Sequence, residues 1–457
     1  MEFLNLELPV AHLPELDKSF VPLEAFFAAH QKLAKKPVCV AVERSRGQIG
    51  VWETALIGTP EYAEADAYYM DRLVKFLLWS WGGFKVSICG DEQAAARIAA
   101  AYSAGGSRAF DKEFMEKVYE RPFEVESLPY DKKPAAHQVS EALGRHTNGC
   151  RIGFDAGGSD RKVSAVIDGE CVYSEEVVWF PKTNADPDYH YNGILEAFRT
   201  AASKMPRVDG IGVSSAGVYI DNKPMVASLF LKVPAGLYDS KVKNIYMRAA
   251  AAIGDVPLVV ANDGDVTALA GAMGLSDNAV LGIAMGTSEA AGYVDPAGNI
   301  TGWLNELAFA PVDGAPDAME DEWSGDIGCG VKYFSQDGVI KLAPRAGITL
   351  NGDSPAEKLK EVQALMAEDD DRAAAVYRSI GVYLAHTLAL YARFYSIRHV
   401  LMLGRVMSGK GGDIILETAC SVLGEAYPDI PWRPEAPDEK TRRVGQSVAA
   451  ATLPEVK

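Results

Sequence analysis

The chain has 457 residues, of which 48% are hydrophobic and 23% are charged, so its length suits about three globular domains. Its formal net charge of −17 at pH 7 argues against a nucleic-acid partner, because binding to a phosphate backbone draws on clustered Lys and Arg. The first 150 residues carry 17 basic and 21 acidic side chains, so the sequence predicts no basic arm there.

The N-terminal segment carries Glu2 and Glu7 before its first basic residue, which is not the pattern of a signal peptide. No apolar run approaches the length of a membrane span, so we expect no membrane partner. The six cysteines occur singly, without CxxC pairs, which suggests reduced thiols and a cytoplasmic location.

The first predicted elements are a β-hairpin over residues 38–58 and a helix that leads into a strand over 68–90. The aromatic residues from Phe76 to Phe84 suit a core better than a dimer interface. A polar, helix-breaking segment over 129–149 predicts a domain boundary. Residues 1–135 are interpreted either as a decayed repeat of the fold that follows or as an unrelated α/β module.

The stretch from Arg151 to Ser164 predicts a second hairpin, because its apolar residues alternate on either side of a turn over 155–160. Glycines in such a turn let backbone N–H groups approach an anion closely, and Asp155 can hold a hydrated divalent cation. An ordinary glycine-rich hairpin turn is the alternative interpretation.

Further along the chain, predicted strands alternate with predicted helices, which indicates an α/β fold. A helix over 372–394 has apolar residues on almost every face, as a buried helix does, and leads into a strand that ends at Gly404. The other elements are strands at 208–217, 257–263 and 281–286, helices at 241–254 and 265–274, and a hairpin at 291–302.

Asn262 and Asp263 stand where a predicted strand ends and a helix begins. Asp263 could cap that helix, which is a common role. A carboxylate at the C-terminal end of a strand is also suited to act as the general base for a sugar hydroxyl, and Asn262 could hydrogen-bond the same substrate.

Two glycine-containing turns follow later strands. Gly286, Thr287 and Ser288 offer backbone amides and hydroxyls to phosphate oxygens. Gly404, with the glycines at 409, 411 and 412, either packs under an adenine ring or forms a surface loop, in which we expect Lys410 to be solvated.

In their order along the chain, these segments resemble the ROK family of sugar kinases and related repressors, in the hexokinase, Hsp70 and actin superfamily. The resemblance covers residues 150–457 and rests on seven segments: FDAGGS, GIGVSSAG, VVANDGDVTALAGAMG, LGIAMGTSEAAGYVDPAGNITG, NELAFAPV, SGDIGCGVKYFSQDGVIKLA and VLMLGRVMSGKGG. It implies an α/β, two-domain actin/hexokinase-like (ribonuclease H-like) fold, with an additional N-terminal α/β region over 1–135 and kinase-like domains over 150–262 and 263–457.

The resemblance also implies a function for each matching position. Asp263 matches the catalytic base, and Asp155 matches the hairpin aspartate that organises Mg²⁺ through water. Asn262 and Glu306 match residues that bind sugar hydroxyls. The positions that match ATP-binding residues are Gly157, Gly158 and Ser159 in the first phosphate turn, Gly286 and Thr287 in the second, and Gly404 in the adenosine segment.

The sequence departs from the family pattern at its zinc motif. The family has a histidine three residues after its glutamate, where this chain has Phe309, and a cysteine cluster, of which only Cys329 is present. Because four ligands cannot be assembled from this segment, we expect no structural zinc and expect apolar packing around Phe309 instead.

Two other departures concern the substrates. Glu289 stands where the family has a glycine-rich run, and a carboxylate beside ATP phosphates is repulsive. Either Glu289 points away from the phosphates or nucleotide binding is altered. Residues 228–230 replace an asparagine-containing sugar loop, so the sugar contacts of the family are not carried over there.

The sequence therefore predicts an ATP-dependent and Mg²⁺-dependent kinase that phosphorylates a hexose or amino-hexose. A non-catalytic sugar sensor is the alternative, favoured by Glu289 and the altered sugar loop and opposed by the presence of both Asp155 and Asp263. A DNA-binding repressor of the family would need a basic helix-turn-helix, which the first 150 residues do not supply. The resemblance also implies a homodimer.

Overall fold

The computed structural model describes residues 1–140, 143–437 and 445–456. The chain folds into two compact units, each built from separate stretches of sequence. The first unit comprises 1–139, 283–291 and 303–436, and the second unit comprises 140–282, 292–302 and 437–457. The residues of the N-terminal region thus belong to the same unit as most of the C-terminal third of the chain.

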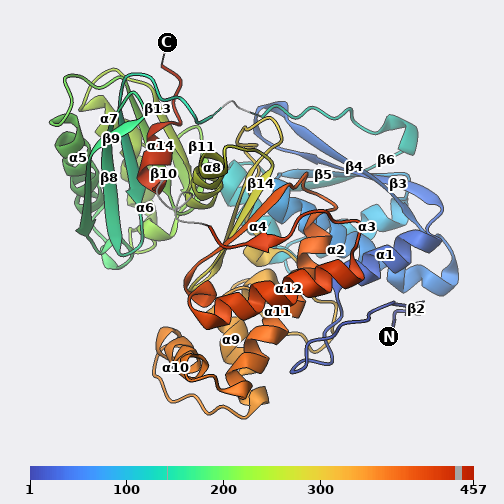
Figure 1. Cartoon of the computed structure of the whole chain (residues 1–457). Coiled ribbons are helices and arrows are strands. Elements are labelled where there is room, and N and C mark those ends of the chain that lie inside the picture. Colours follow the sequence, from blue (N-terminus) through green and yellow to red (C-terminus); the bar gives the residue numbers. More distant parts are fainter. Residues whose placement is uncertain (141–142, 438–444, 457) are drawn as a thin grey trace. The chain divides into compact units, whose positions relative to one another are not determined.

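The second unit is built on a five-stranded mixed sheet with the strand order β13-β10-β7-β8-β9 (Figure 1). β7, β8 and β9 pair antiparallel in succession, whereas β10 runs parallel to both β7 and β13. The bounds of these strands are β7 Cys150–Ala156, β8 Asp160–Ile167, β9 Glu170–Val178, β10 Gly210–Ser215 and β13 Leu258–Asn262.

The two faces of this sheet follow from the alternation of its side chains. Ile152 and Phe154 of β7 are fully buried in a core that includes Phe198 of helix α5. On the opposite face, a side chain at Gly153 or Gly212 would collide with the backbone of helix α14. The helices and short strands of the unit are α5 Pro187–Ala202, α6 Ala235–Leu237, α7 Ile245–Ala251, α8 Asp263–Leu275, α14 Gln446–Ala451, β11 Val218–Ile220 and β12 Lys223–Val226.

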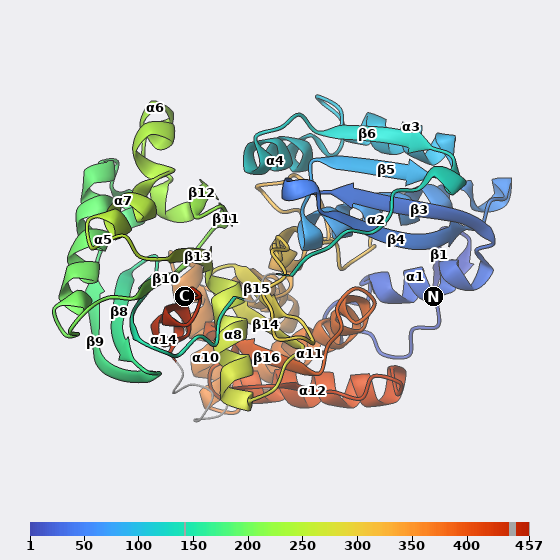
Figure 2. The ribbon, with the colours of Figure 1, turned by 90° about the horizontal axis from the view of Figure 1, so that it is seen from above.

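The N-terminal part of the first unit is a four-stranded sheet with the order β4-β3-β5-β6, drawn in blue and cyan in Figure 2. The predicted hairpin is formed by β3 and β4, and the predicted helix and strand are α2 and β5. The elements are α1 Leu23–Leu33, β3 Lys36–Glu43, β4 Ile49–Leu56, α2 Ala63–Trp81, β5 Lys85–Cys89, α3 Glu92–Ala101, α4 Ala109–Tyr119 and β6 Glu124–Leu128, preceded by the short strands β1 Glu2–Phe3 and β2 Leu6–Glu7.

Strand directions distinguish this sheet from that of the second unit. The strand that follows the helix, β5, pairs antiparallel with β3, whereas the corresponding β10 pairs parallel with β7. The strand pairing of the two regions thus differs, and the decayed repeat stays a hypothesis.

The remainder of the first unit contains a second sheet with the order β15-β14-β16-β17. The predicted buried helix is α11, which packs along α12 and is buried from residue 373 to 391 except at Arg378. The elements are β14 Val280–Met285, β15 Glu289–Val294, α9 Gln336–Leu342, α10 Pro355–Ala367, α11 Asp371–Tyr391, β16 His399–Leu403, α12 Lys410–Ala426 and β17 Pro434–Glu435. The chain passes between the two units within β14 and β15.

A shared core joins the two parts of the first unit. Phe76 on α2 is fully buried and stacks on Phe394, with 4.2 Å between the ring centroids. The carboxylate of Glu24 on α1 accepts two hydrogen bonds from the guanidinium of Arg393. Trp79, Trp81 and Phe84 are at most 7% exposed, so the prediction that the aromatic residues from Phe76 to Phe84 form a core is confirmed.

The predicted hairpin over 291–302 is wrong in its second half. β15 ends at Val294, and a single bridge between Val294 and Ile300 replaces the second strand. The reason is local, because the Asp295 carboxylate accepts hydrogen bonds from the amides of Ala297 and Asn299 and holds the backbone in a turn.

All six cysteines are free thiols. In the part of the chain that the structure describes, none of the helices combines the length and the hydropathy that a bilayer crossing requires.

Candidate active site

Asp155 lies near the end of β7, beside the turn of the β7–β8 hairpin that the sequence predicts. The Ser214 hydroxyl, at the end of the neighbouring β10, donates a hydrogen bond of 2.9 Å to its carboxylate. Burial raises the pKa of Asp155 to about 6, and the negative charge of Asp263 adds to the rise. Asp155 is therefore a carboxylate close to a second acid, in a position that a cation would stabilise.

The turn that follows Asp155 carries Gly157, Gly158 and Ser159. The Gly157 carbonyl accepts a hydrogen bond of 2.8 Å from the indole of Trp179. A side chain at Gly158 would overlap the end of the Lys182 side chain, whose Nζ would lie 2.9 Å from the added Cβ. Lys182 is therefore seated against the turn, and it is a candidate phosphate ligand that the sequence analysis missed.

Asp263 is the first residue of α8, and this residue is half-buried. Burial raises its pKa above the usual range, while the Gly264 amide and the positive charge of Lys182 act in the opposite direction. Lys182 therefore lies close enough to both the phosphate turn and Asp263 to influence them.

Asn262, rather than Asp263, caps the N-terminus of α8. The Asn262 side-chain oxygen accepts a hydrogen bond of 2.7 Å from the Gly264 amide, and its nitrogen donates one of 2.8 Å to the Gly217 carbonyl. Both polar atoms of Asn262 are engaged with the backbone, so a structural role accounts for this residue without a ligand.

The second predicted phosphate turn, residues 286–288, joins β14 to β15 and accepts hydrogen bonds from two other segments of the first unit. The Gly286 carbonyl accepts a hydrogen bond of 2.9 Å from the Gln336 amide, and the Thr287 hydroxyl accepts one of 2.6 Å from the Arg405 guanidinium. Gly404, just before Arg405, has φ of 97°, and a Cβ there would collide with the Met285 carbonyl. The structure thus brings Gly404 against the end of β14, next to Gly286.

Glu306 is presented by a segment that is hydrogen-bonded to the C-terminal end of α2. The amides of Leu304, Asn305 and Glu306 donate to the carbonyls of Trp81, Ser80 and Trp79, at 3.3, 2.9 and 2.9 Å. These are carbonyls of the last helical turn, which have no partner inside the helix. The N-terminal region therefore fixes the backbone of the predicted sugar-binding glutamate.

Glu289 points into the interior of the first unit. It is 3% exposed, and the Tyr391 hydroxyl lies close enough to its carboxyl group to influence it. Burial raises the pKa of Glu289 to about 8, and the charge of Glu306 adds to the rise. Of the two alternatives that the sequence leaves open, the structure supports the first, because the side chain turns away from the exposed turn.

Phe309 stands where the resemblance calls for a histidine, and it lies among aromatic rings. Its ring centroid is 4.4 Å from that of Trp79, 5.6 Å from Phe110 and 6.3 Å from Phe114. Among the described residues, no group of three or more His, Cys, Asp and Glu side chains is arranged to hold a metal ion. The expected apolar packing around Phe309 is present.

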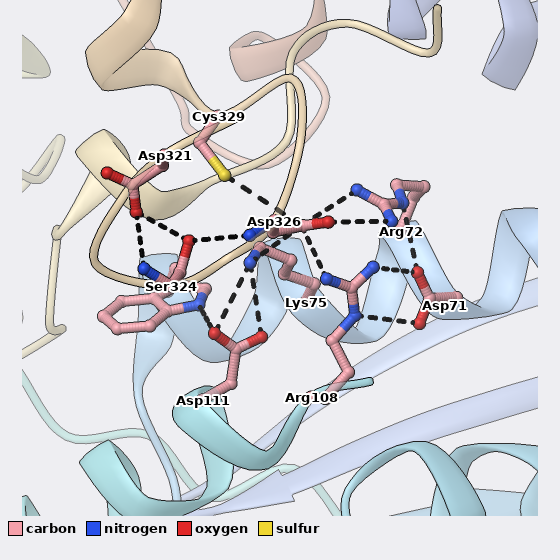
Figure 3. A network of polar contacts seen from close by, with 10 residues as sticks. Asp71, Arg72, Lys75, Arg108, Asp111, Asp321, Ser324, Asp326 and Cys329 are labelled. Atoms are coloured by element: carbon pink, nitrogen blue, oxygen red, sulfur yellow. Dashed lines mark hydrogen bonds and ion pairs between the residues drawn. The ribbon is translucent and has the colours of Figure 1, made fainter. Parts of the chain in front are cut away.

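The segment that carries Cys329 is held by a buried network of charges (Figure 3). The carboxylate of Asp326 contacts Arg72, Lys75 and Arg108 at 3.1, 3.0 and 2.6 Å. The Cys329 thiol lies 3.9 Å from the same carboxylate. Two further acids complete the network, with Asp71 bridging the two arginines and Asp111 contacting Lys75. Three cations from the N-terminal region thus converge on one acid in the segment that resembles the zinc motif.

Residues 228–230, in place of the asparagine-containing sugar loop, form one turn of 3₁₀-helix. Leu229 and Phe230 are buried in the core of the second unit, and the Leu229 carbonyl is 3.1 Å from Nε2 of His190. The two apolar side chains serve packing and offer no amide to a ligand.

The candidate residues form two groups. Asp155, Lys182, Asn262 and Asp263, with the first phosphate turn, belong to the second unit, whereas Glu306 and the residues of the second phosphate turn belong to the first, together with Gly404. Lys182 and Arg405 could not be found from the sequence, since a single basic residue after a strand forms no pattern.

The structure is similar to that of a ROK hexokinase from Thermus thermophilus, with a TM-score of 0.51 and 18% sequence identity, over 66% of this chain and 97% of that chain. The chain has the ROK hexokinase fold. The predicted fold class is confirmed, and the ROK fold accounts for about two thirds of the chain. No protein-family model and no curated protein matches the sequence.

Two other solved structures with the ROK fold are also similar to this chain. One is a ROK family glucokinase from Streptomyces griseus in complex with glucose and AMPPNP, with a TM-score of 0.48 and 18% identity over 67% of this chain and 99% of that chain. The other is a ROK family transcriptional regulator, a homologue of the E. coli MLC protein, with a TM-score of 0.49 and 19% identity over 71% of this chain and 82% of that chain.

Proposed function

We propose that the chain is an ATP-dependent sugar kinase that transfers the γ-phosphoryl group to a hydroxyl of a hexose or amino-hexose. The observation that carries the proposal is the cluster of Asp155, Asp263 and Lys182 beside a glycine-containing turn, at the C-terminal ends of parallel strands. Two acids and a cation beside such a turn suit phosphoryl transfer, which depends on positioning and on electrostatic stabilisation.

Asp263 acts as the general base in this proposal. Its carboxylate accepts the proton of the sugar hydroxyl as the oxygen forms a bond to the γ-phosphorus, and the bond from that phosphorus to the β-phosphate oxygen breaks to release ADP. The raised pKa of Asp263 makes its carboxylate a better proton acceptor than an ordinary aspartate.

The residues around Asp155 fit Mg²⁺. The ion prefers hard oxygen ligands and keeps several waters, so one carboxylate beside substrate phosphates is a suitable donor set. The pKa of Asp155 is raised by burial and by Asp263, which is the situation that a divalent cation relieves. Bound there, Mg²⁺ would neutralise phosphate charge, while Asp155 would hold it through water.

The other candidate residues complete the proposed binding of substrates. Lys182 and the backbone of residues 157–159 would contact phosphate oxygens. Gly286 and Thr287 would bind further phosphate oxygens, with Arg405 bracing Thr287, and Gly404 would lie beside adenosine. Glu306 would accept hydrogen bonds from sugar hydroxyls, and Asn262 would hold the backbone that presents Asp263.

A coupled ADP-release assay tests this proposal with a panel of neutral hexoses and N-acetylhexosamines. We expect hexose-stimulated turnover in the wild type and a loss of about 10²–10⁴-fold in kcat for Asp263→Asn, because the base is removed. Asp255→Asn, an exposed acid in the same unit, is the matched control and should retain wild-type turnover. Turnover that persists in Asp263→Asn would contradict the assignment of the base.

A non-catalytic sugar sensor is the second candidate function. The observation that favours it is the burial of Leu229 and Phe230, which leaves the position of the family's sugar loop without an amide ligand. Titration calorimetry separates the two functions, since hexose binding without affinity for ATP supports the sensor.

A DNA-binding repressor is not proposed, because residues 1–139 are built around the β4-β3-β5-β6 sheet and share a core with the C-terminal part of their unit. A homodimer and a cytoplasmic location remain part of the proposed function, and gel filtration with light scattering tests the first of them.

A further inference from the structure

Glu289 is an acid in the interior of the first unit, and its neighbours among the described titratable groups are Tyr391 and Glu306, not a cation. Burial of an ionised carboxylate without an opposite charge is strongly unfavourable, so the protonated form of such a group is favoured. The Tyr391 hydroxyl of α11 interacts with Glu289, and burial raises the pKa of this phenol well above its usual range, so Tyr391 is neutral as well. Among the described residues, the other titratable group that faces Glu289 is Glu306.

Gly330 lies between the side chain of Glu289 and the backbone next to Glu306. A Cβ added to Gly330 would collide with Oε2 of Glu289 and would lie 2.6 Å from the carbonyl of Leu307, the residue after Glu306. The Glu289 carboxyl group and the carbonyl of Leu307, one residue after Glu306, therefore pack against the same glycine, which has no side chain to separate them.

Two acids that share one buried region do not both ionise at neutral pH. Glu306 is half-buried, whereas Glu289 is 3% exposed, so the negative charge is less costly on Glu306 and the proton belongs on Glu289. The pKa of about 8 for Glu289 agrees with this assignment.

We propose that Glu289 is a positioning residue for Glu306: held as a neutral acid against Gly330, next to the backbone that follows Glu306, Glu289 leaves Glu306 to carry the charge that accepts hydrogen bonds from sugar hydroxyls. This inference rests on the proposed function, from which it takes the sugar-binding role of Glu306. It also assigns a role to an acid next to the second phosphate turn, since Glu289 follows Ser288 directly. Ionisation of Glu289 would repel Glu306 from its binding orientation and weaken the binding of the hexose.

Proton uptake on hexose binding is the first test, and it needs no catalysis. Wild-type protein is titrated at pH 8 with each neutral hexose of the panel, in two buffers of different ionisation enthalpy. If the hexose selects the form with protonated Glu289, about half a proton is taken up for each hexose bound, because Glu289 is half-ionised at this pH. Glu289→Gln should bind the hexose with no uptake.

The pH dependence of the hexose KM is the second test. In the wild type, KM should be about tenfold higher at pH 9 than at pH 7, with kcat at saturating hexose unchanged, because the competent fraction falls to about a tenth. In Glu289→Gln, an amide of the same shape, KM should be flat over this range. Glu417→Gln, an exposed acid on α12, is the matched control and should follow the wild type. Circular dichroism melts confirm that each variant is folded.

The outcomes separate this inference from the proposed function. Hexose binding without proton uptake, or an alkaline rise in KM that Glu289→Gln retains, overturns the role of Glu289 and leaves the kinase standing. Proton uptake without ADP release supports Glu289 and overturns the kinase. Failure of the wild type to bind any hexose overturns both.

Discussion

Two buried acids of the first unit, Asp326 and Glu289, differ in the charged groups that surround them. Burial alone would raise the pKa of Asp326, but the charges of Arg72, Lys75 and Arg108 outweigh it and hold this pKa well below the usual range. Glu289 is buried to a similar extent without a cation beside it, and burial raises its pKa to about 8 although the Tyr391 hydroxyl acts in the opposite direction. The surroundings rather than the depth of burial thus decide whether an acid is a permanent charge or a neutral group that titrates near neutral pH.

The different surroundings of Asp326 and Glu289 suit them to different roles, one in the stability of the fold and the other in a binding site. The Asp326 network joins three cations of the N-terminal region to a segment more than 200 positions further along the chain, and these cations hold the pKa of its central acid well below the usual range. Glu289 has no comparable stabilising charge beside it. A buried acid with a strongly raised pKa is more typical of a functional site than of a structural ion pair. Three substitutions test the contrast.

Asp326→Ala should give the largest loss of stability. Removing this carboxylate leaves three buried cations with only two acids between them, and breaking such a network by removing one partner costs about 3–5 kcal/mol. Urea denaturation followed by circular dichroism measures the change, with Asp317→Ala, an exposed acid of the same segment, as the control. A loss no greater than that of the control would show that the network contributes little.

Glu289→Gln should remove a pH dependence. The folded pKa of Glu289 is raised, so the wild-type protein holds a proton that the unfolded chain releases between pH 4.5 and pH 8. The free energy of unfolding of the wild type should therefore fall as pH rises through this window, by at most about 1.4 kcal/mol per pH unit, and level off above it. The amide variant should lack this decline. Parallel stability curves for the two proteins would mean that Glu289 does not change its charge on unfolding.

Gly330→Ala should have the smallest effect of the three. The added methyl group meets the Glu289 carboxyl group and the Leu307 carbonyl, and overpacking of this kind costs about 1–3 kcal/mol. Gly236→Ala, where a Cβ meets nothing within 4 Å, is the control and should be neutral or slightly stabilising. The melting temperatures of the two variants measure the difference, and equal values would remove the evidence that Glu289 packs tightly here.

The parts of the fold that could be predicted from the sequence are those determined by local pattern. The β7–β8 hairpin follows from the alternation of Ile152 and Phe154 with Val163 and Ala165, and α11 follows from its apolar surface. The hairpin over 291–302 failed because hydrogen bonds of the Asp295 side chain, rather than strand pairing, decide the backbone there.

The parts that could not be predicted depend on contacts between distant residues. The cations around Asp326 come from α2 and from the start of α4, and no spacing in the sequence relates either segment to Asp326. Lys182 contacts the turn at Gly158 because the short helical turn over 181–183, which follows β9, lies beside it. The burial of Glu289 depends on Tyr391 and Gly330, which lie far along the chain.

The attachment of Glu306 to the end of α2 has a consequence for protein engineering. A chain shortened to begin near residue 140 would match the length of a ROK hexokinase, yet it would lose the three carbonyls that hold residues 304–306 and all three cations that hold Asp326. A metal-binding loop transplanted into residues 303–330 would likewise lie against side chains that pack on Asp326 and Phe309. The N-terminal 139 residues and the loop over 303–330 therefore form a single exchangeable module, to be kept or replaced together.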